Sequence, residues 1–276
     1  MRISPAVGTL DDAAFDEELA SDPDVALGLL ADMASATDPQ LRQLARRLAG
    51  RVLVHLARGG PARAGGVGRL RVAPMQDGGD VDFDSSMDAL LGAAARRSSP
   101  SLTDLRARQW ARPTTGLCLL VDRSGSMGGR RLATAALAAA AVAFRAPGDY
   151  SVVTFAEEVT LVKGQDEERP VEAVVDDILA LRGRGTTNLA AALDEGRAQL
   201  SRSRATHRGM LLISDCRANT GADPLLAARA VDRLMILAPA GDSAEARALA
   251  DAVGGRCVEI SGPSSVPAGL AALVGS

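Results

Sequence analysis

The chain has 276 residues, with 31 basic and 34 acidic side chains and a formal net charge of −3. This balance gives no indication of nucleic-acid binding, and no apolar run approaches the ~18–20 residues that a membrane span needs. The three cysteines are too sparse for a disulfide framework, and no N-terminal signal pattern is visible. We therefore expect a cytoplasmic protein without nucleic-acid or membrane partners.

Residues 1–58 are expected to form a mainly helical region. Two short helices are predicted at Asp11–Ala20 and Asp24–Ala34, and Asp38 followed by Pro39 is a typical start for a longer helix. The longer helix has apolar residues at helical spacing, namely Leu41, Leu44, Leu48 and Val52.

Residues 59–112 change character and are predicted to be a linker and lead-in segment. Paired glycines and a Gly-Pro step between residues 59 and 79 break regular structure and favour a loop. A short helix is expected near Ser86–Arg96. The stretch Leu102–Arg112 fits either a helix or an extended segment.

Residues 113–276 are predicted to form an α/β domain. Leu117–Val121 and Met210–Ile213 are continuous apolar runs, which are typical of strands buried on both faces. The short connection between Tyr150–Phe155 and Val159–Val162 indicates a hairpin, so one of these strands should be antiparallel. Helices alternate with these strands, beginning with the alanine-rich segment Arg130–Phe144. The pattern predicts a doubly wound, Rossmann-like, mostly parallel sheet with one antiparallel edge strand.

Oxygen-bearing side chains follow two of the predicted buried strands. Asp122, Ser124 and Ser126 come after the first, and Asp215 comes after the second. In open α/β sheets ligands bind beyond the carboxyl ends of the strands, so these side chains should converge if the two strands are neighbours. The flexible loop 183–188 can bring a third hydroxyl to the same place.

Two carboxylates and three hydroxyls form a set of hard oxygen ligands that suits Mg²⁺, with Mn²⁺ and Ca²⁺ as alternatives. The carboxylates balance only the charge of the ion, and the hydroxyls are neutral. The bound ion should therefore accept one more oxygen ligand from outside the chain.

The order of these motifs resembles the metal-ion-dependent adhesion site (MIDAS) of von Willebrand factor A (VWA) domains. Asp122, Ser124 and Ser126 match the Asp-x-Ser-x-Ser motif, Thr187 matches the threonine of the Gly-Thr-Asn loop, and Asp215 matches the aspartate of the Thr-Asp-Gly motif. The resemblance covers about residues 115–276. It implies that these five residues hold the metal ion.

The third motif departs from the family pattern. Ser214 stands in place of its usual threonine and Cys216 in place of its usual glycine, which raises a question about the backbone just after Asp215. The stretch Asp215–Asn219 also resembles part of magnesium-chelatase D subunits.

The whole chain is more similar to stand-alone bacterial CoxE-type proteins, which work beside MoxR-type AAA+ ATPases. This resemblance implies an adaptor whose metal ion grips a Glu or Asp of a partner protein, with a MoxR-type ATPase as a candidate partner. The alternative, in line with the similarity of Asp215–Asn219 to magnesium-chelatase D subunits, is a chelatase-type or maturation subunit that takes part directly in metal insertion into a cofactor.

The sequence favours a protein without enzymatic activity. A serine-hydrolase elbow around Ser126 needs glycine where Ser124 stands, and a phosphatase of the haloacid-dehalogenase type needs an aspartate there. The histidines, His55 and His207, belong to no catalytic motif. No phosphate-binding loop is present, so any ATPase must be a separate subunit.

Overall fold

The structure is a computed structural model, and it describes residues 12–34, 39–58, 69–77, 80–111, 114–124, 129–183 and 185–274. The chain divides into two compact units. The first combines Met1–Arg63 with Thr115–Ser276, and the second is Ala64–Thr114.

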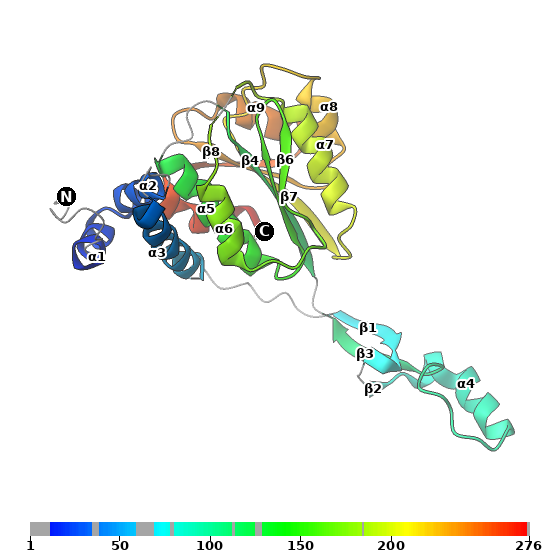
Figure 1. Cartoon of the computed structure of the whole chain (residues 1–276). Coiled ribbons are helices and arrows are strands. Elements are labelled where there is room, and N and C mark those ends of the chain that lie inside the picture. Colours follow the sequence, from blue (N-terminus) through cyan, green and yellow to red (C-terminus); the bar gives the residue numbers. More distant parts are fainter. Residues whose placement is uncertain are drawn as a thin grey trace. The chain divides into compact units, whose positions relative to one another are not determined.

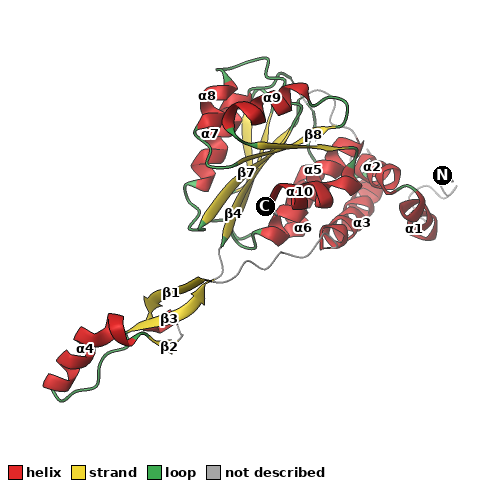
Figure 2. Cartoon of the chain, turned by 180° about the vertical axis from the view of Figure 1, so that it is seen from behind, coloured by secondary structure: helices red, strands yellow, loops and turns green. Residues whose placement is uncertain are grey.

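A six-stranded sheet forms the centre of the first unit, in the order β6-β5-β4-β7-β8-β9 (Figure 2). All neighbouring strands are parallel except β6, which is antiparallel to β5 at the edge. The predicted fold class, including the antiparallel edge strand, is confirmed. The strands are β4 (Thr115–Asp122), β5 (Tyr150–Phe155), β6 (Val159–Lys163), β7 (His207–Ile213), β8 (Leu234–Pro239) and β9 (Arg256–Ile260).

Helices cover both faces of this sheet (Figures 1 and 2). Strand β4 shows why, because Leu117 and Leu119 belong to one buried cluster whereas Cys118 and Leu120 belong to another. Apolar side chains therefore point both ways along the strand. One face carries α5 (Gly129–Arg145), α6 (Val171–Leu179) and α10 (Val266–Val274), and the other carries α7 (Leu189–Leu200), α8 (Pro224–Arg229) and α9 (Ala244–Val253).

The N-terminal helices pack against α5 and share the core of the sheet domain. They are α1 (Asp12–Ser21), α2 (Pro23–Met33) and α3 (Pro39–Arg58), and the predicted helical character of this region is confirmed. Helix α5 is buried between these helices and the sheet, so every residue from Leu132 to Ala143 is buried. A helix that is buried all round must be apolar all round, which explains its alanine content.

Helix α2 approaches the start of α5 very closely. A Cβ atom added to Gly129 would lie 2.7 Å from Oδ2 of Asp32, and one added to Gly28 would lie 2.9 Å from Cγ of Arg130. The backbone N–H of Gly129 donates to Oδ1 of Asp32 at 2.6 Å, so an α2 carboxylate caps the N-terminus of α5. Farther along the chain, the N–H of Ser264 donates to Oδ1 of Asp24 at 2.7 Å.

The second unit has a three-stranded antiparallel sheet, in the order β1-β3-β2, and one helix. Its elements are β1 (Arg69–Pro74), β2 (Asp80–Val81), α4 (Phe83–Ala95) and β3 (Arg106–Ala111). The helix was expected from the sequence, and the ambiguous stretch after residue 102 contains a strand. The interpretation of residues 59–80 as a loop was wrong where β1 forms.

Three large apolar side chains on α4, those of Phe83, Met87 and Leu91, are exposed. None of the helices that the structure describes is long and apolar enough to cross a membrane.

Candidate metal centre

Neighbouring strands bring Asp122 and Asp215 to the same edge of the sheet. Strands β4 and β7 are parallel, and Val121 is paired with Ile213 in the ladder. Asp122 is the last residue of β4, and Asp215 lies two residues beyond the end of β7. Because parallel strands end at the same edge, the two carboxylates emerge side by side.

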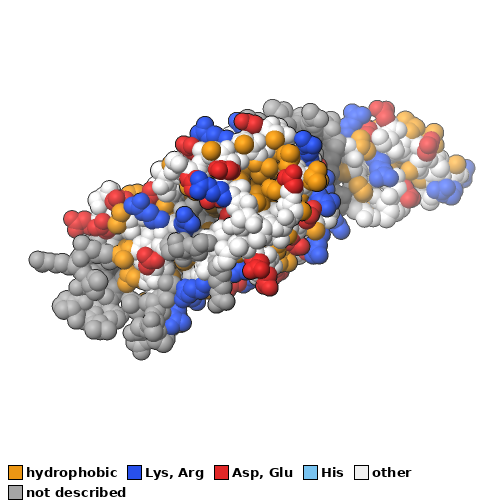
Figure 3. Space-filling model, turned by 90° about the horizontal axis from the view of Figure 1, so that it is seen from above, with side chains coloured by type: hydrophobic (Ala, Val, Ile, Leu, Met, Phe, Trp, Pro, Cys, Tyr) orange, Lys and Arg blue, Asp and Glu red, His pale blue; other side chains and the backbone are white. Residues whose placement is uncertain are grey.

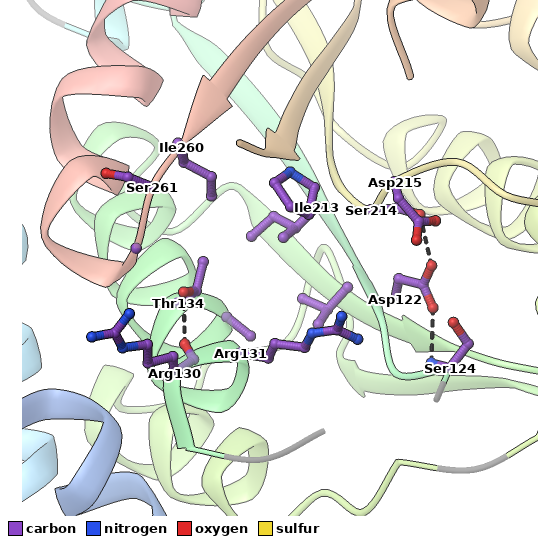
Figure 4. A pocket seen from close by; sticks show the side chains of 14 residues that line it. Asp122, Ser124, Arg130, Arg131, Thr134, Ile213, Ser214, Asp215, Ile260 and Ser261 are labelled. Atoms are coloured by element: carbon purple, nitrogen blue, oxygen red, sulfur yellow. Dashed lines mark hydrogen bonds between the residues drawn. The ribbon is translucent and has the colours of Figure 1, made fainter. Parts of the chain in front are cut away.

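The carboxylate of Asp122 is held at both oxygens by the chain itself (Figure 4). The backbone N–H of Ser124 donates to Oδ1 at 2.8 Å, and the hydroxyl of Ser214 donates to Oδ2 at 2.6 Å. Each carboxylate oxygen has two lone pairs, so one remains on each atom for a further partner. The Ser214 oxygen in turn accepts from the N–H of Cys216 at 2.8 Å.

Asp215 accepts the N–H of Arg217 at Oδ1, with a distance of 2.9 Å. The guanidinium of Arg217 turns to other acids and forms ion pairs with Asp242 and Glu245. The guanidinium of Arg217 therefore does not pair with Asp215, whose negative charge can act on a bound cation.

The donor atoms that meet here fit a hard divalent cation such as Mg²⁺, because they are carboxylate and hydroxyl oxygens. Among the described residues, no group of three or more His, Cys, Asp or Glu side chains could hold a metal ion. The two carboxylates would need further oxygen ligands, which hydroxyl groups can supply. Ser124 is half-buried beside Asp122 and offers one such hydroxyl.

Thr187 is buried and tied by its backbone to the loop that follows Asp215. Its N–H donates to Oδ1 of Asn219 at 2.7 Å, and its carbonyl accepts the N–H groups of Asn219 and Thr220 at 3.2 and 3.3 Å. The next residue, Asn188, caps helix α7 by accepting from the N–H of Ala191 at 3.2 Å. Thr187 is thus attached to the candidate centre through Asn219, although it does not line the cavity described below. Ser126 lies outside the described residues.

Cys216 adopts a backbone conformation that favours glycine. Its φ angle is +64°, in the left-handed region where residues with a Cβ atom are strained. The side chain is 6% exposed, and burial together with the charges of nearby Asp215 and Asp122 raises the pKa of its thiol above the usual range. The substitution of cysteine for glycine therefore places a strained, left-handed residue directly after Asp215.

A cavity of about 170 Å³ adjoins the candidate ligands. Asp122, Ser124, Ser214 and Asp215 lie on one side of it, and Ile260 and Ser261 lie on the other (Figure 4). On the face of the molecule that Figure 3 shows, basic and acidic side chains surround a group of hydrophobic ones. Asp122, Ser124 and Asp215 are only partly buried, so their side chains can be reached from outside.

Sequence motifs alone did not reveal two of the residues that organise the centre. Ser214 was noted only as a replacement for threonine, yet it positions Asp122. Asn219 was noted only within a stretch similar to chelatase subunits, yet it holds the Thr187 loop. The signal for Asn219 was that stretch itself, since its spacing from Asp215 is what allows it to reach Thr187.

A mostly parallel sheet with this strand order, with Asp122, Ser124 and Asp215 at its carboxyl edge, defines a VWA-type domain. The chain belongs to the family described as VWA domain containing CoxE-like protein, whose model matches residues 54–259. No curated protein gives a significant match.

Several solved structures are similar to part of this chain at low identity. The conserved hypothetical protein BatB from Bacteroides thetaiotaomicron is 13% identical, with a TM-score of 0.46, over 59% of this chain and 100% of that one. A von Willebrand factor type A protein from Catenulispora acidiphila is 19% identical, with a TM-score of 0.45, over 58% of this chain and 42% of that one. Proximal thread matrix protein 1 from the mussel byssus, with a zinc-occupied MIDAS motif, is 13% identical, with a TM-score of 0.45, over 59% and 47%.

Proposed function

We propose that this chain is an adaptor that binds Mg²⁺ at the carboxyl edge of its sheet and uses the ion to grip a Glu or Asp of a partner protein. The observation that carries the proposal is the meeting of Asp122, Ser124 and Asp215 at one open cavity. Their oxygen atoms suit a hard cation, and the family is one of VWA domains.

The residues that would hold the ion are Asp122, Ser124, Ser126, Thr187 and Asp215. When bound, the ion supplies a positive charge that attracts a carboxylate from outside. The protein's own contribution is to fix the ligands, since Ser214 orients Asp122 and Asn219 holds the loop of Thr187. Hydrogen-bonded partners of this kind keep ligands in place before the ion arrives.

We propose a binding role without catalysis. A hydrolase would need a base beside a serine nucleophile, and the sequence offers only two histidines for this task. His207 begins β7 and therefore lies at the opposite end of that strand from Asp215, while His55 is exposed on α3. Neither histidine lines the cavity beside Asp122 and Asp215.

A MoxR-type AAA+ ATPase is the candidate partner, because the chain resembles CoxE-type proteins that work with such ATPases. We favour this role over that of a chelatase-type subunit. The stretch Asp215–Asn219, which suggested the chelatase, serves here to bind the Thr187 loop by hydrogen bonds. The cytoplasmic location stays a prediction from cysteine content.

The test is a pull-down from native cytosol with the full chain as bait, in Mg²⁺ and in excess chelator, together with calorimetric Mg²⁺ titration. We expect Asp122→Ala to lose Mg²⁺ binding while the chain stays folded. In the pull-down, this variant should fail to capture the same partners that excess chelator removes from the unchanged chain. Asp251→Ala, an exposed aspartate of α9, is the matched control and should behave like the unchanged chain. Partners that stay bound without metal would show that the site has no role in capture.

A further inference from the structure

The cavity beside the candidate metal ligands extends away from them to a region that aliphatic side chains line in part. Its polar end is formed by Asp122, Ser124 and Asp215. It then passes between the ends of β4 and β7, the first turns of α5 and the segment after β9 (Figure 4). One continuous space therefore joins the candidate metal ligands, where a carboxylate would bind, to a region with aliphatic side chains.

Away from the metal ligands, aliphatic side chains line much of the cavity, together with the hydroxyls of Thr134 and Ser261. Val121, Ala135 and Ile260 are buried, and Ile213 is half-buried at the end of β7, where the cavity meets it. The volume of about 170 Å³ is comparable with that of an engineered apolar cavity of about 150 Å³ that binds benzene. One large aliphatic or aromatic side chain would fill it.

The rim of the cavity is basic. Arg130 and Arg131 line it from the start of α5, and both side chains are exposed. Their charge favours an acidic ligand over a basic one and suits a partner segment that already carries the carboxylate for the metal ion.

We propose that this cavity is a specificity pocket for the partner: it receives a Leu- or Phe-class side chain close to the Glu or Asp that the metal ion grips, within an acidic segment. This inference rests on the proposed function. It adds that recognition has two points, because one metal–carboxylate contact selects poorly among the many acidic side chains of other proteins. A buried apolar anchor beside it supplies the discrimination.

Simple carboxylic acids test the pocket with the full chain. All the test ligands carry the same carboxylate: acetate, phenylacetate, 3-phenylpropionate and 4-phenylbutyrate. Acetate has no ring, and the other three place a phenyl group at an increasing distance from the carboxylate. Their dissociation constants are measured by NMR titration of the protein with Mg²⁺ and, separately, with excess chelator. With Mg²⁺, we expect at least one phenyl acid to bind about tenfold more tightly than acetate, because its ring leaves water for the cavity. Chelator should abolish this binding.

A variant at the rim separates the pocket from the metal site. Ser261 is exposed and lines the cavity, so Ser261→Trp should block it and remove the advantage of the phenyl acids without changing Mg²⁺ affinity. Ser264→Trp is the matched control, since Ser264 is exposed in the same segment but does not line the cavity. It should keep the advantage.

Each outcome bears on a different step. If acetate and the phenyl acids bind equally in the presence of Mg²⁺, or if Ser261→Trp leaves the phenyl advantage intact, the pocket is overturned and the metal-dependent grip stands. If the phenyl acids bind equally well in chelator, the link between pocket and metal ion is wrong. If none of the acids responds to Mg²⁺ although the ion binds, the proposed function fails together with the pocket.

Discussion

Ser214 shows how a single hydroxyl can organise the candidate centre. It donates to Asp122 and accepts from the N–H of Cys216, so its removal leaves two polar groups without their partner. We expect Ser214→Ala to lower the free energy of unfolding by about 1–3 kcal/mol. The affinity for Mg²⁺ should fall roughly 10–100-fold, because Asp122 is no longer held in place.

The check is calorimetric Mg²⁺ titration combined with urea unfolding. Ser214→Thr keeps the hydroxyl and should restore Mg²⁺ affinity. A purely structural role for Ser214 would instead appear as lost stability in Ser214→Ala with Mg²⁺ affinity unchanged.

Cys216 carries backbone strain that different substitutions should reveal. Its left-handed conformation costs roughly 1–2 kcal/mol for a residue with a Cβ atom, and a β-branched residue fits worse. Cys216→Val should therefore destabilise the chain by about 2 kcal/mol or more. In Cys216→Gly the strain is relieved but a buried side chain is lost, so the net change should stay within about 1 kcal/mol.

Thermal and urea unfolding of both variants tests this expectation. Cys118→Val is the control, because Cys118 is equally buried but lies in β4, where a β-branched residue is favourable. Equal losses at both cysteines would mean that the φ angle of Cys216 has no bearing on stability.

At the scale of elements, helix α2 holds the first residue of α5. Asp32 accepts the N–H of Gly129, which is the first residue of α5 and directly follows the segment that carries Ser126. A carboxylate at a helix N-terminus contributes about 1 kcal/mol. We expect Asp32→Ala to lose about that much stability and to weaken Mg²⁺ binding, because the metal loop is less well anchored at its end.

Differential scanning calorimetry and Mg²⁺ titration of Asp32→Ala provide the measurement. Asp251→Ala removes an exposed aspartate from α9 and should change neither quantity. If Asp32→Ala keeps its full Mg²⁺ affinity while losing stability, α2 supports the fold but not the metal loop.

At the scale of the whole molecule, the two compact units make separable contributions. Ala64–Thr114 has its own sheet and helix, and the sheet domain closes its core with the N-terminal helices. Replacing Ala64–Thr114 by a Gly/Ser linker of about 20 residues, which spans ~25 Å on average, should leave the first unit folded. Its Mg²⁺ affinity should stay within about threefold of that of the full chain.

Circular dichroism, thermal unfolding and Mg²⁺ titration of the shortened chain test this separation. A chain that fails to show a cooperative transition would mean that the second unit is needed to fold the first. A folded chain that no longer captures the partners of the full chain would place part of the partner surface on Ala64–Thr114.

The sequence by itself determined the fold class, because buried strands appear as apolar runs and the helices between them keep their own spacing. Leu117–Val121 and Met210–Ile213 are strands as predicted, and the order of Asp122 and Asp215 after them indicated a metal site at one sheet edge. The five-residue ligand set stays a prediction.

Only the tertiary structure decided which residues far apart in the chain support one another. The structure shows that the hydroxyl of Ser214 donates to Asp122. It also shows that Asn219 accepts the N–H of Thr187. The alanines of α5 suggested a helix but not that α2 and α3 would cover it. The cavity likewise exists only where β4, β7, α5 and the segment after β9 meet. Local patterns encode strands and helices, whereas such contacts depend on the packing of the whole chain.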